Sequence, residues 1–184
     1  NAGRTAEAVK YYQHMIARHV EPTAWIKSTL VRGYATDGDL VNANKLYQEV
    51  LSEGAPTMTV FFPVLELFGL MGESGQLDKV LQDMAKFHLQ PIASTFVIIF
   101  RMLYDYNFYD QLPARMAQLE KSGITPNIAI HKFIIQLELQ NQQVEKAERY
   151  FKSIEASLPP HMHPILRSLF QRASDRKQAF VAPH

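Results

Sequence analysis

Proline returns along this chain at an almost constant interval, and no other feature of the sequence restricts the possible folds as strongly. The members of this series are separated by 34 or 35 residues and are Pro22, Pro56, Pro91, Pro126 and Pro160. A fixed period between about 20 and 50 residues indicates a fold that is built from stacked copies of one small unit.

The clearest joint between two units lies at residues 121–127. Gly123 suits the left-handed conformation that ends a helix, and Pro126 cannot continue that helix. Asn127 can then cap the helix that follows, because its side-chain oxygen accepts from a backbone N–H of the first turn. The proline series is therefore expected to mark the ends of helices.

An apolar stripe with the spacing i, i+3, i+4, i+7 precedes each proline and has the same period. The stripes begin at Ala8, Ala43, Leu77, Leu112 and Ala147. Arg115 is a charged intruder in the fourth stripe, whereas Tyr47, Leu81 and Phe151 occupy equivalent positions that are expected to be buried. Because two unrelated features share one period, we predict an all-α fold, a right-handed α-solenoid of antiparallel helix pairs.

The period also sets the expected domain organisation, a single solenoid over residues 1–174. We predict a partial repeat at 1–23, whole repeats at 24–57, 58–92, 93–127 and 128–161, and a partial repeat at 162–174. The pattern fades after residue 174, so residues 175–184 are expected to form a frayed C-terminal tail. The chain opens inside a repeat helix, and we expect it to be a fragment of a longer protein.

Composition excludes several classes of protein. The formal net charge is +1 and the pI is about 8.1, far from the basic footprint of a tight nonspecific nucleic-acid binder. Without cysteine the chain can form neither a disulfide nor a zinc site with thiolate ligands. No apolar run is long enough to predict a membrane span.

The repeat resembles a known family. A second helix of the type at residues 7–15, the Gly-Ile-Thr-Pro-Asn closure at 123–127, and the segments 30–34 and 43–51 are similar to the pentatricopeptide repeat. The tetratricopeptide repeat, with a 34-residue period, is the alternative. The interval of 14 residues from Ala8 to Pro22, which returns from Leu77 to Pro91, looks more like the pentatricopeptide form.

This resemblance implies a protein that binds single-stranded RNA rather than DNA, in mitochondria or another organelle, with one repeat for each base. The implied base-facing positions of the first helices are Ser28, Phe62, Val97, Lys132 and Arg167. Their partners at the repeat ends are Thr57, Ile92, Asn127 and His161. Only Ser28 and Asn127 fit the residue types of the family, and Phe62 with Ile92 cannot make a hydrogen-bonded readout. The expected code is therefore degenerate.

Basic residues on the first helices can form a broken strip for phosphates, although isolated Lys and Arg are more often only solvated. They are Lys27, Arg32, Arg101, Lys132 and Arg167. Trp25 can stack on a base, but a lone Trp at a repeat junction is more often a core residue, and we expect it in the core.

No residue pattern indicates an enzyme, a cofactor or a metal site. His161 and His163 lie close together, but a metal needs more ligands than these two. Two hypotheses remain. The first is an RNA-binding adaptor in mitochondrial RNA processing, stability or translation, which Lys132 and Arg167 favour. The second is a protein-binding scaffold, for example within a mitochondrial ribonucleoprotein or ribosome assembly, which Phe62 and the Phe108–Tyr109 turn favour.

Overall fold

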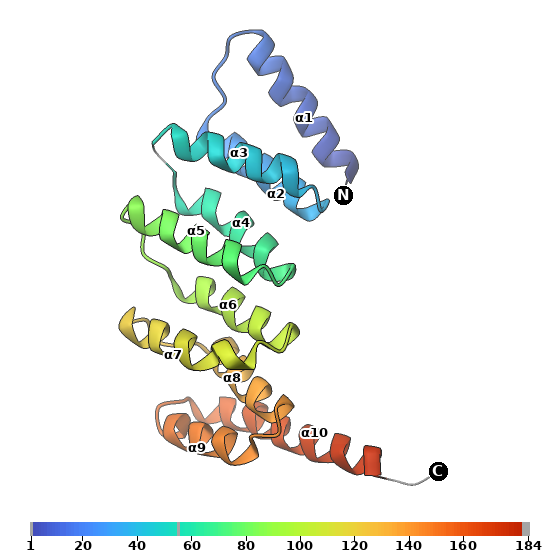
Figure 1. The fold of residues 1–184 in the computed structure, drawn as a ribbon, viewed down its shortest axis with the longest axis vertical. Helices are drawn as coiled ribbons and strands as arrows, with labels where there is room; N and C mark the ends of the chain where they lie inside the picture. Colours follow the sequence, from blue (N-terminus) through green and yellow to red (C-terminus); the bar gives the residue numbers. More distant parts are fainter. Residues whose placement is uncertain (1, 55, 182–184) are drawn as a thin grey trace. The chain divides into compact units, whose positions relative to one another are not determined.

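In the computed structural model, residues 2–54 and 56–181 are described, with side chains for 4–54 and 56–173. These residues form α-helices and two short 3-10 helices, without a strand (Figure 1). The bounds are α1 (Ala2–Ala17), α2 (Ala24–Thr36), α3 (Leu40–Ser52), α4 (Met58–Leu70), α5 (Ser74–Lys86), α6 (Ala93–Asp105), η1 (Tyr109–Gln111), α7 (Leu112–Lys121), α8 (Ile128–Gln140), α9 (Val144–Glu155), η2 (Pro160–Met162) and α10 (His163–Val181). The predicted all-α repeat fold is confirmed.

The helices come in pairs that follow the proline series. The first helices α2, α4, α6 and α8 each begin two residues after a proline of the series, namely Pro22, Pro56, Pro91 and Pro126. Contacts between residues divide the chain into two compact units, residues 1–91 and residues 92–184. The extent of a single solenoid and the repeat boundaries within it stay predictions.

In the first unit, α2 packs on α1, α3 and α4, and α5 packs on α4. The first helices α2 and α4 therefore form one layer, and the second helices α3 and α5 cover it (Figure 1). Tyr47 and Leu81 keep 2% and 8% of their surface exposed, so their predicted burial is confirmed. Tyr11 of the first stripe is 65% exposed, because α1 contacts mainly α2.

In the second unit, α8 lies between α6 and α10 and also contacts α9, while α7 packs on α6. Its core contains Ile135, Ala147 and Phe151, with Leu166 and Leu169 from α10. The charged intruder Arg115 is 8% exposed and donates to Gln118 Oε1 at 3.2 Å. The helical pattern thus gives the correct buried face even where the residue is charged.

The turns use the predicted signals. Asn127 caps α8 by accepting from the backbone N–H of Ile130 at 3.1 Å, and Gly123 has a φ of 68°. The C-terminal prediction was wrong in one respect, because α10 continues to Val181 and residues 175–181 are helical rather than frayed. Residues 182–184 of the predicted tail lie outside the described residues.

Candidate nucleic-acid interface

Ser28, the residue that best fits a base-reading position, is 4% exposed. Its hydroxyl donates to the carbonyl of Ala24 at 2.6 Å and lies 3.5 Å from Thr59 Oγ1 on the neighbouring helix α4. A side chain this deep between α2 and α4 cannot meet a base without a movement of the helices. The interpretation of Ser28 as a base-reading residue therefore finds no support in its position.

The equivalent positions of the other first helices differ from one another. Phe62 and Val97 are half-buried, and Lys132 and Arg167 are exposed. Lys132 lies over the ring of Phe133, with its Nζ 5.9 Å from the ring centre. Arg167 donates to Glu155 at 2.5 Å, so α9 already compensates its charge. Of these side chains, Lys132 alone is exposed without an ion-pair partner in the part of the chain that the structure describes.

The predicted partners at the repeat ends, Thr57, Ile92, Asn127 and His161, are all exposed. Thr57 Oγ1 is 2.6 Å from Thr59 Oγ1, which in turn lies 3.5 Å from the hydroxyl of Ser28, so the three hydroxyls form one cluster. The side-chain oxygen of Asn127 is occupied as the cap of α8. The role of Asn127 as the cap of α8 therefore explains the presence of asparagine at this position without any contact to RNA.

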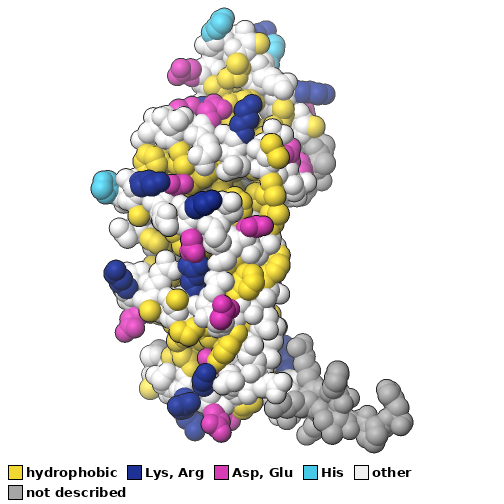
Figure 2. Space-filling view, in the orientation of Figure 1, with side chains coloured by type: hydrophobic (Ala, Val, Ile, Leu, Met, Phe, Trp, Pro, Cys, Tyr) yellow, Lys and Arg dark blue, Asp and Glu magenta, His cyan; other side chains and the backbone are white. Residues whose placement is uncertain are grey.

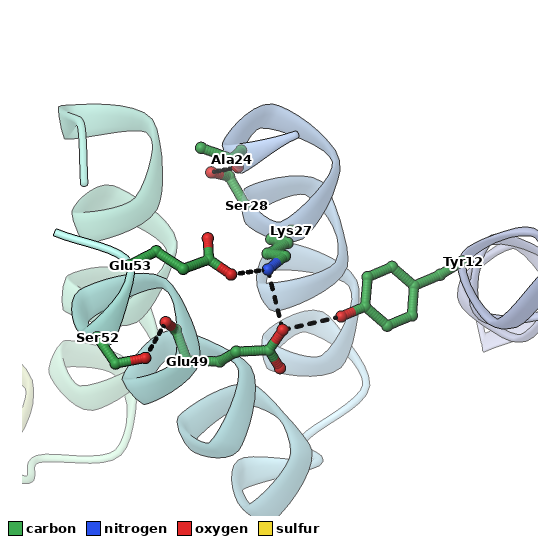
Figure 3. Close-up of polar contacts among 7 residues, drawn as sticks. All are labelled: Tyr12, Ala24, Lys27, Ser28, Glu49, Ser52 and Glu53. Atoms are coloured by element: carbon green, nitrogen blue, oxygen red, sulfur yellow. Dashed lines mark hydrogen bonds and ion pairs between the residues drawn. The ribbon is translucent and has the colours of Figure 1, made fainter. Parts of the chain in front are cut away.

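Lys27 was wrongly placed in the basic strip, because its side chain is 5% exposed and points toward Glu49 and Glu53 (Figure 3). Its Nζ donates to Glu49 at 2.9 Å and also to Glu53, and Tyr12 donates to the same Glu49 oxygen at 3.3 Å. Burial lowers the pKa of Lys27, but the hydrogen bonds to Glu53 and Glu49 outweigh burial and raise that pKa above its ordinary value. Lys27 therefore joins α1, α2 and α3 and is not available to a phosphate.

Trp25 is 69% exposed, and the expectation that it belongs to the core was wrong. Thr23 caps α2, so Trp25 is the second helical residue and lies beside the buried face that contains Leu30 and Val31. The corresponding residues in the later repeats are Thr59, Ser94 and Ala129, which are small or polar. A comparison between repeats would have identified Trp25 as a surface residue.

The remaining basic candidates are Arg32, which is exposed on α2, and Arg101, which is half-buried on α6. Sequence reasoning missed the aromatic pair beside the second unit's cations: Tyr104 and Phe133 join α6 to α8, with ring centres 6.0 Å apart. The adjacency of Lys132 and Phe133 was the available signal. Arg101 lies one helical turn before Tyr104 on α6, so cations and aromatic rings share this part of the α6–α8 layer.

Among the described residues there is no candidate metal site and no candidate membrane span. No group of three His, Asp or Glu side chains there can hold a metal ion. His163 Nε2 lies 3.2 Å from the carbonyl oxygen of Leu158 instead. None of the described helices combines the length and apolarity of a membrane span.

Comparison with known proteins agrees with this architecture. The family described as PPR repeat matches residues 26–54. The pentatricopeptide repeat protein PPR10 from maize is 19% identical with a TM-score of 0.69, over 91% of this chain and 24% of PPR10. PPR10 in complex with an 18-nucleotide psaJ RNA element is 16% identical with a TM-score of 0.68, over 83% and 23%.

The pentatricopeptide repeat domain of Arabidopsis thaliana protein-only RNase P 1, in complex with tRNA, is 11% identical with a TM-score of 0.74. That match covers 92% of this chain and 91% of the domain, whereas the chain spans only about a quarter of PPR10. No curated protein sequence matches the chain significantly. The chain is thus a helical-repeat protein. Residues 26–54 match the PPR repeat family, and the described helices have the fold of pentatricopeptide repeat proteins.

Proposed function

We propose that this protein is an RNA-binding adaptor in organelle gene expression, with weak and mainly phosphate-directed contacts. The observation that carries the proposal is the group of Arg101, Lys132, Tyr104 and Phe133 on α6 and α8. Cations that face phosphates give affinity with little sequence preference, and aromatic rings beside them accept bases of any identity. The similarity to two repeat proteins whose structures contain bound RNA supports the choice of ligand.

The positions that read bases in the family support weak sequence preference. Ser28 is enclosed, Phe62 and Val97 have no hydrogen-bonding group, and the side-chain oxygen of Asn127 caps a helix. Base identity is read through hydrogen bonds to base edges, so these residues offer little direct readout. RNA is then bound through phosphate contacts and base stacking, without a catalytic step by this chain.

Charge reversal of Lys132 and Arg101 tests the proposal. Lys132→Glu with Arg101→Glu should weaken binding about equally for a pool of single-stranded RNAs, and should reduce the slope of log K against log salt by roughly 1.4, or about 0.7 for each lost contact. Fluorescence anisotropy at two salt concentrations measures both quantities. Lys79→Glu is the matched control, because Lys79 is exposed on the second helix α5.

Two outcomes would reject phosphate-directed binding. Tight, salt-resistant binding to one short RNA that Asn127→Ala abolishes would show that the chain reads sequence. No RNA binding, together with stable capture of a protein, would favour the scaffold function. The exposed apolar residues Trp25 and Val41, at 69% and 78% exposure, are the observation that keeps the scaffold as a second candidate.

The organelle belongs to the proposal as well. The family resemblance favours mitochondria, with another organelle as the alternative, and RNA processing, stability or translation as the process. Fractionation of cells that express the tagged natural protein would test the location. Recovery outside organelles would reject this part of the proposal while leaving RNA binding intact.

A further inference from the structure

A groove of about 330 Å³ lies between α9 and α10 in the second unit. Four of its residues, Glu148, Phe151, Lys152 and Glu155, follow the spacing i, i+3, i+4, i+7 and so share one face of α9. Arg167 and Phe170 line it from α10. Figure 2 shows acidic and basic side chains mixed over the region of α9. The volume is sufficient for one nucleotide-sized ligand.

The wall of the groove is fixed before any ligand arrives. Arg167 donates to Glu155 at 2.5 Å, and its guanidinium carbon lies 5.8 Å from the ring centre of Phe151. Phe151 in turn contacts the half-buried Phe170, with ring centres 6.0 Å apart. A guanidinium plane and an aromatic ring are the two surfaces on which unpaired RNA bases stack.

Two exposed charges remain at the rim. Neither the Glu148 side chain nor the Lys152 side chain has a hydrogen bond or an ion pair within the residues that the structure describes. The corresponding residues are Asn44 and Gln48 in α3 and Asp78 and Gln82 in α5, so a carboxylate recurs in α5 whereas the ammonium group of Lys152 is particular to α9 among these helices. One free carboxylate therefore faces the same groove as one free ammonium group and the aromatic wall.

The geometry points to a pocket for a single unpaired guanine nucleotide of an RNA strand, and this inference rests on the proposed RNA-binding function. The base stacks on Phe170 and the plane of Arg167. Glu148 accepts from guanine N1–H and N2–H, the two adjacent donors that match a carboxylate. Lys152 binds the phosphate as a point charge. Adenine, with one donor and one acceptor on that edge, cannot pair with both oxygens.

Calorimetric titration of the whole chain with guanosine 5′-monophosphate tests the pocket. Glu148→Gln should weaken binding about tenfold and leave the weaker binding of adenosine and uridine monophosphates unchanged. Phe170→Leu should weaken all three, because it removes the stacking surface. Glu145→Gln is the matched control, since Glu145 is exposed on α9 but does not line the groove. Circular dichroism verifies that each variant is folded.

The possible results separate this inference from the RNA-binding proposal. If RNA binding depends on Lys132 and Arg101 but guanosine monophosphate does not bind, or binds equally to the Glu148→Gln variant, the pocket is wrong and the RNA interface stands. If an amphipathic peptide binds the groove and no nucleotide does, the groove is a protein site and the inference is overturned. If neither RNA nor nucleotide binds, both proposals fail.

Discussion

One position of the first helix stays buried through the repeats while its chemistry changes completely. It holds Lys27, Phe61, Phe96, His131 and Leu166, with between 0% and 6% of the surface exposed. An apolar residue needs only contacts there, whereas Lys27 requires two carboxylates and His131 requires the hydroxyl of Tyr150, at 2.9 Å from its Nδ1. A polar residue in this position therefore makes its repeat dependent on one particular partner.

His131 should make the stability of the second unit depend on pH. Burial lowers the pKa of His131 below its ordinary 6.5, partly offset by a hydrogen bond with the backbone of Pro126. Below about pH 6.5 the unfolded chain binds a proton that the folded chain resists, so the free energy of unfolding falls by up to about 1.4 kcal/mol per pH unit until the lower folded pKa is reached.

Chemical denaturation between about pH 7.5 and pH 5.5 measures this effect against His131→Phe, the residue type found at Phe61 and Phe96. The other histidines titrate in both proteins, so the difference between the two curves isolates His131. As the pH falls, the free energy of unfolding of His131→Phe should rise relative to that of the unsubstituted protein. Parallel curves would show that His131 does not resist protonation in the folded state.

At the scale of the element, the ends of the helices follow two series of left-handed residues. After the first helices come Gly38, Gly72, Asn107 and Gln142, and after the second helices come His19, Gly54, His88 and Gly123, all with φ between 52° and 79°. Such residues end α1 to α8, and α9 ends instead in the segment 156–160 with Pro159 and Pro160. The left-handed backbone conformation thus recurs at equivalent positions even where the residue type differs.

Gln142→Gly should therefore stabilise the protein, by roughly 0.5–1 kcal/mol. A non-glycine residue in the left-handed region costs about 1–2 kcal/mol, part of which is returned by the smaller entropy of its unfolded state. Gly123→Ala should destabilise by a similar amount, because nothing lies within 4 Å of the added Cβ and only the backbone is strained. Denaturant midpoints at constant m measure both changes in the free energy of unfolding. If the two substitutions change it in the same direction, the assigned left-handed conformations are contradicted.

At the scale of the whole molecule, basic and acidic side chains alternate over the face in Figure 2, and the formal net charge is +1. Long-range attraction of RNA is weak for such a surface, so any binding must come from local groups. Stability is also local, because within each unit the main contacts of the described helices join helices of the same pair or of adjacent pairs.

Hydrogen exchange should show this unevenness within the first unit. Amides of α1 should open at a much lower free energy than those of α4, because Tyr11 and Ile16 are 65% and 50% exposed while Val60 and Phe61 of α4 are fully buried. Tyr12→Phe, which removes the hydrogen bond to Glu49, should lower protection further in α1 and leave α4 unchanged. Equal protection of α1 and α4 would refute this order.

The sequence by itself determined where the helices lie and how they are paired. Prolines, caps and apolar stripes act within one repeat, so their signals are local and appear directly in the chain, as at Gly123, Pro126 and Asn127. Repetition strengthened each signal, because five weak indications at one period are stronger than any of them alone. The wrong expectation for residues 175–181 arose where repetition ended.

Only the tertiary structure decided the surroundings of individual side chains. Ser28 is enclosed by Thr59 of the next repeat, Lys27 is neutralised by Glu49 and Glu53 of another helix, and Arg167 turns to Glu155. In each case the deciding partner lies at least 12 residues away, and its reach depends on how the helices pack. Local patterns fix the backbone of a repeat protein, but the neighbouring helix decides whether a polar side chain faces water, a ligand or a buried partner.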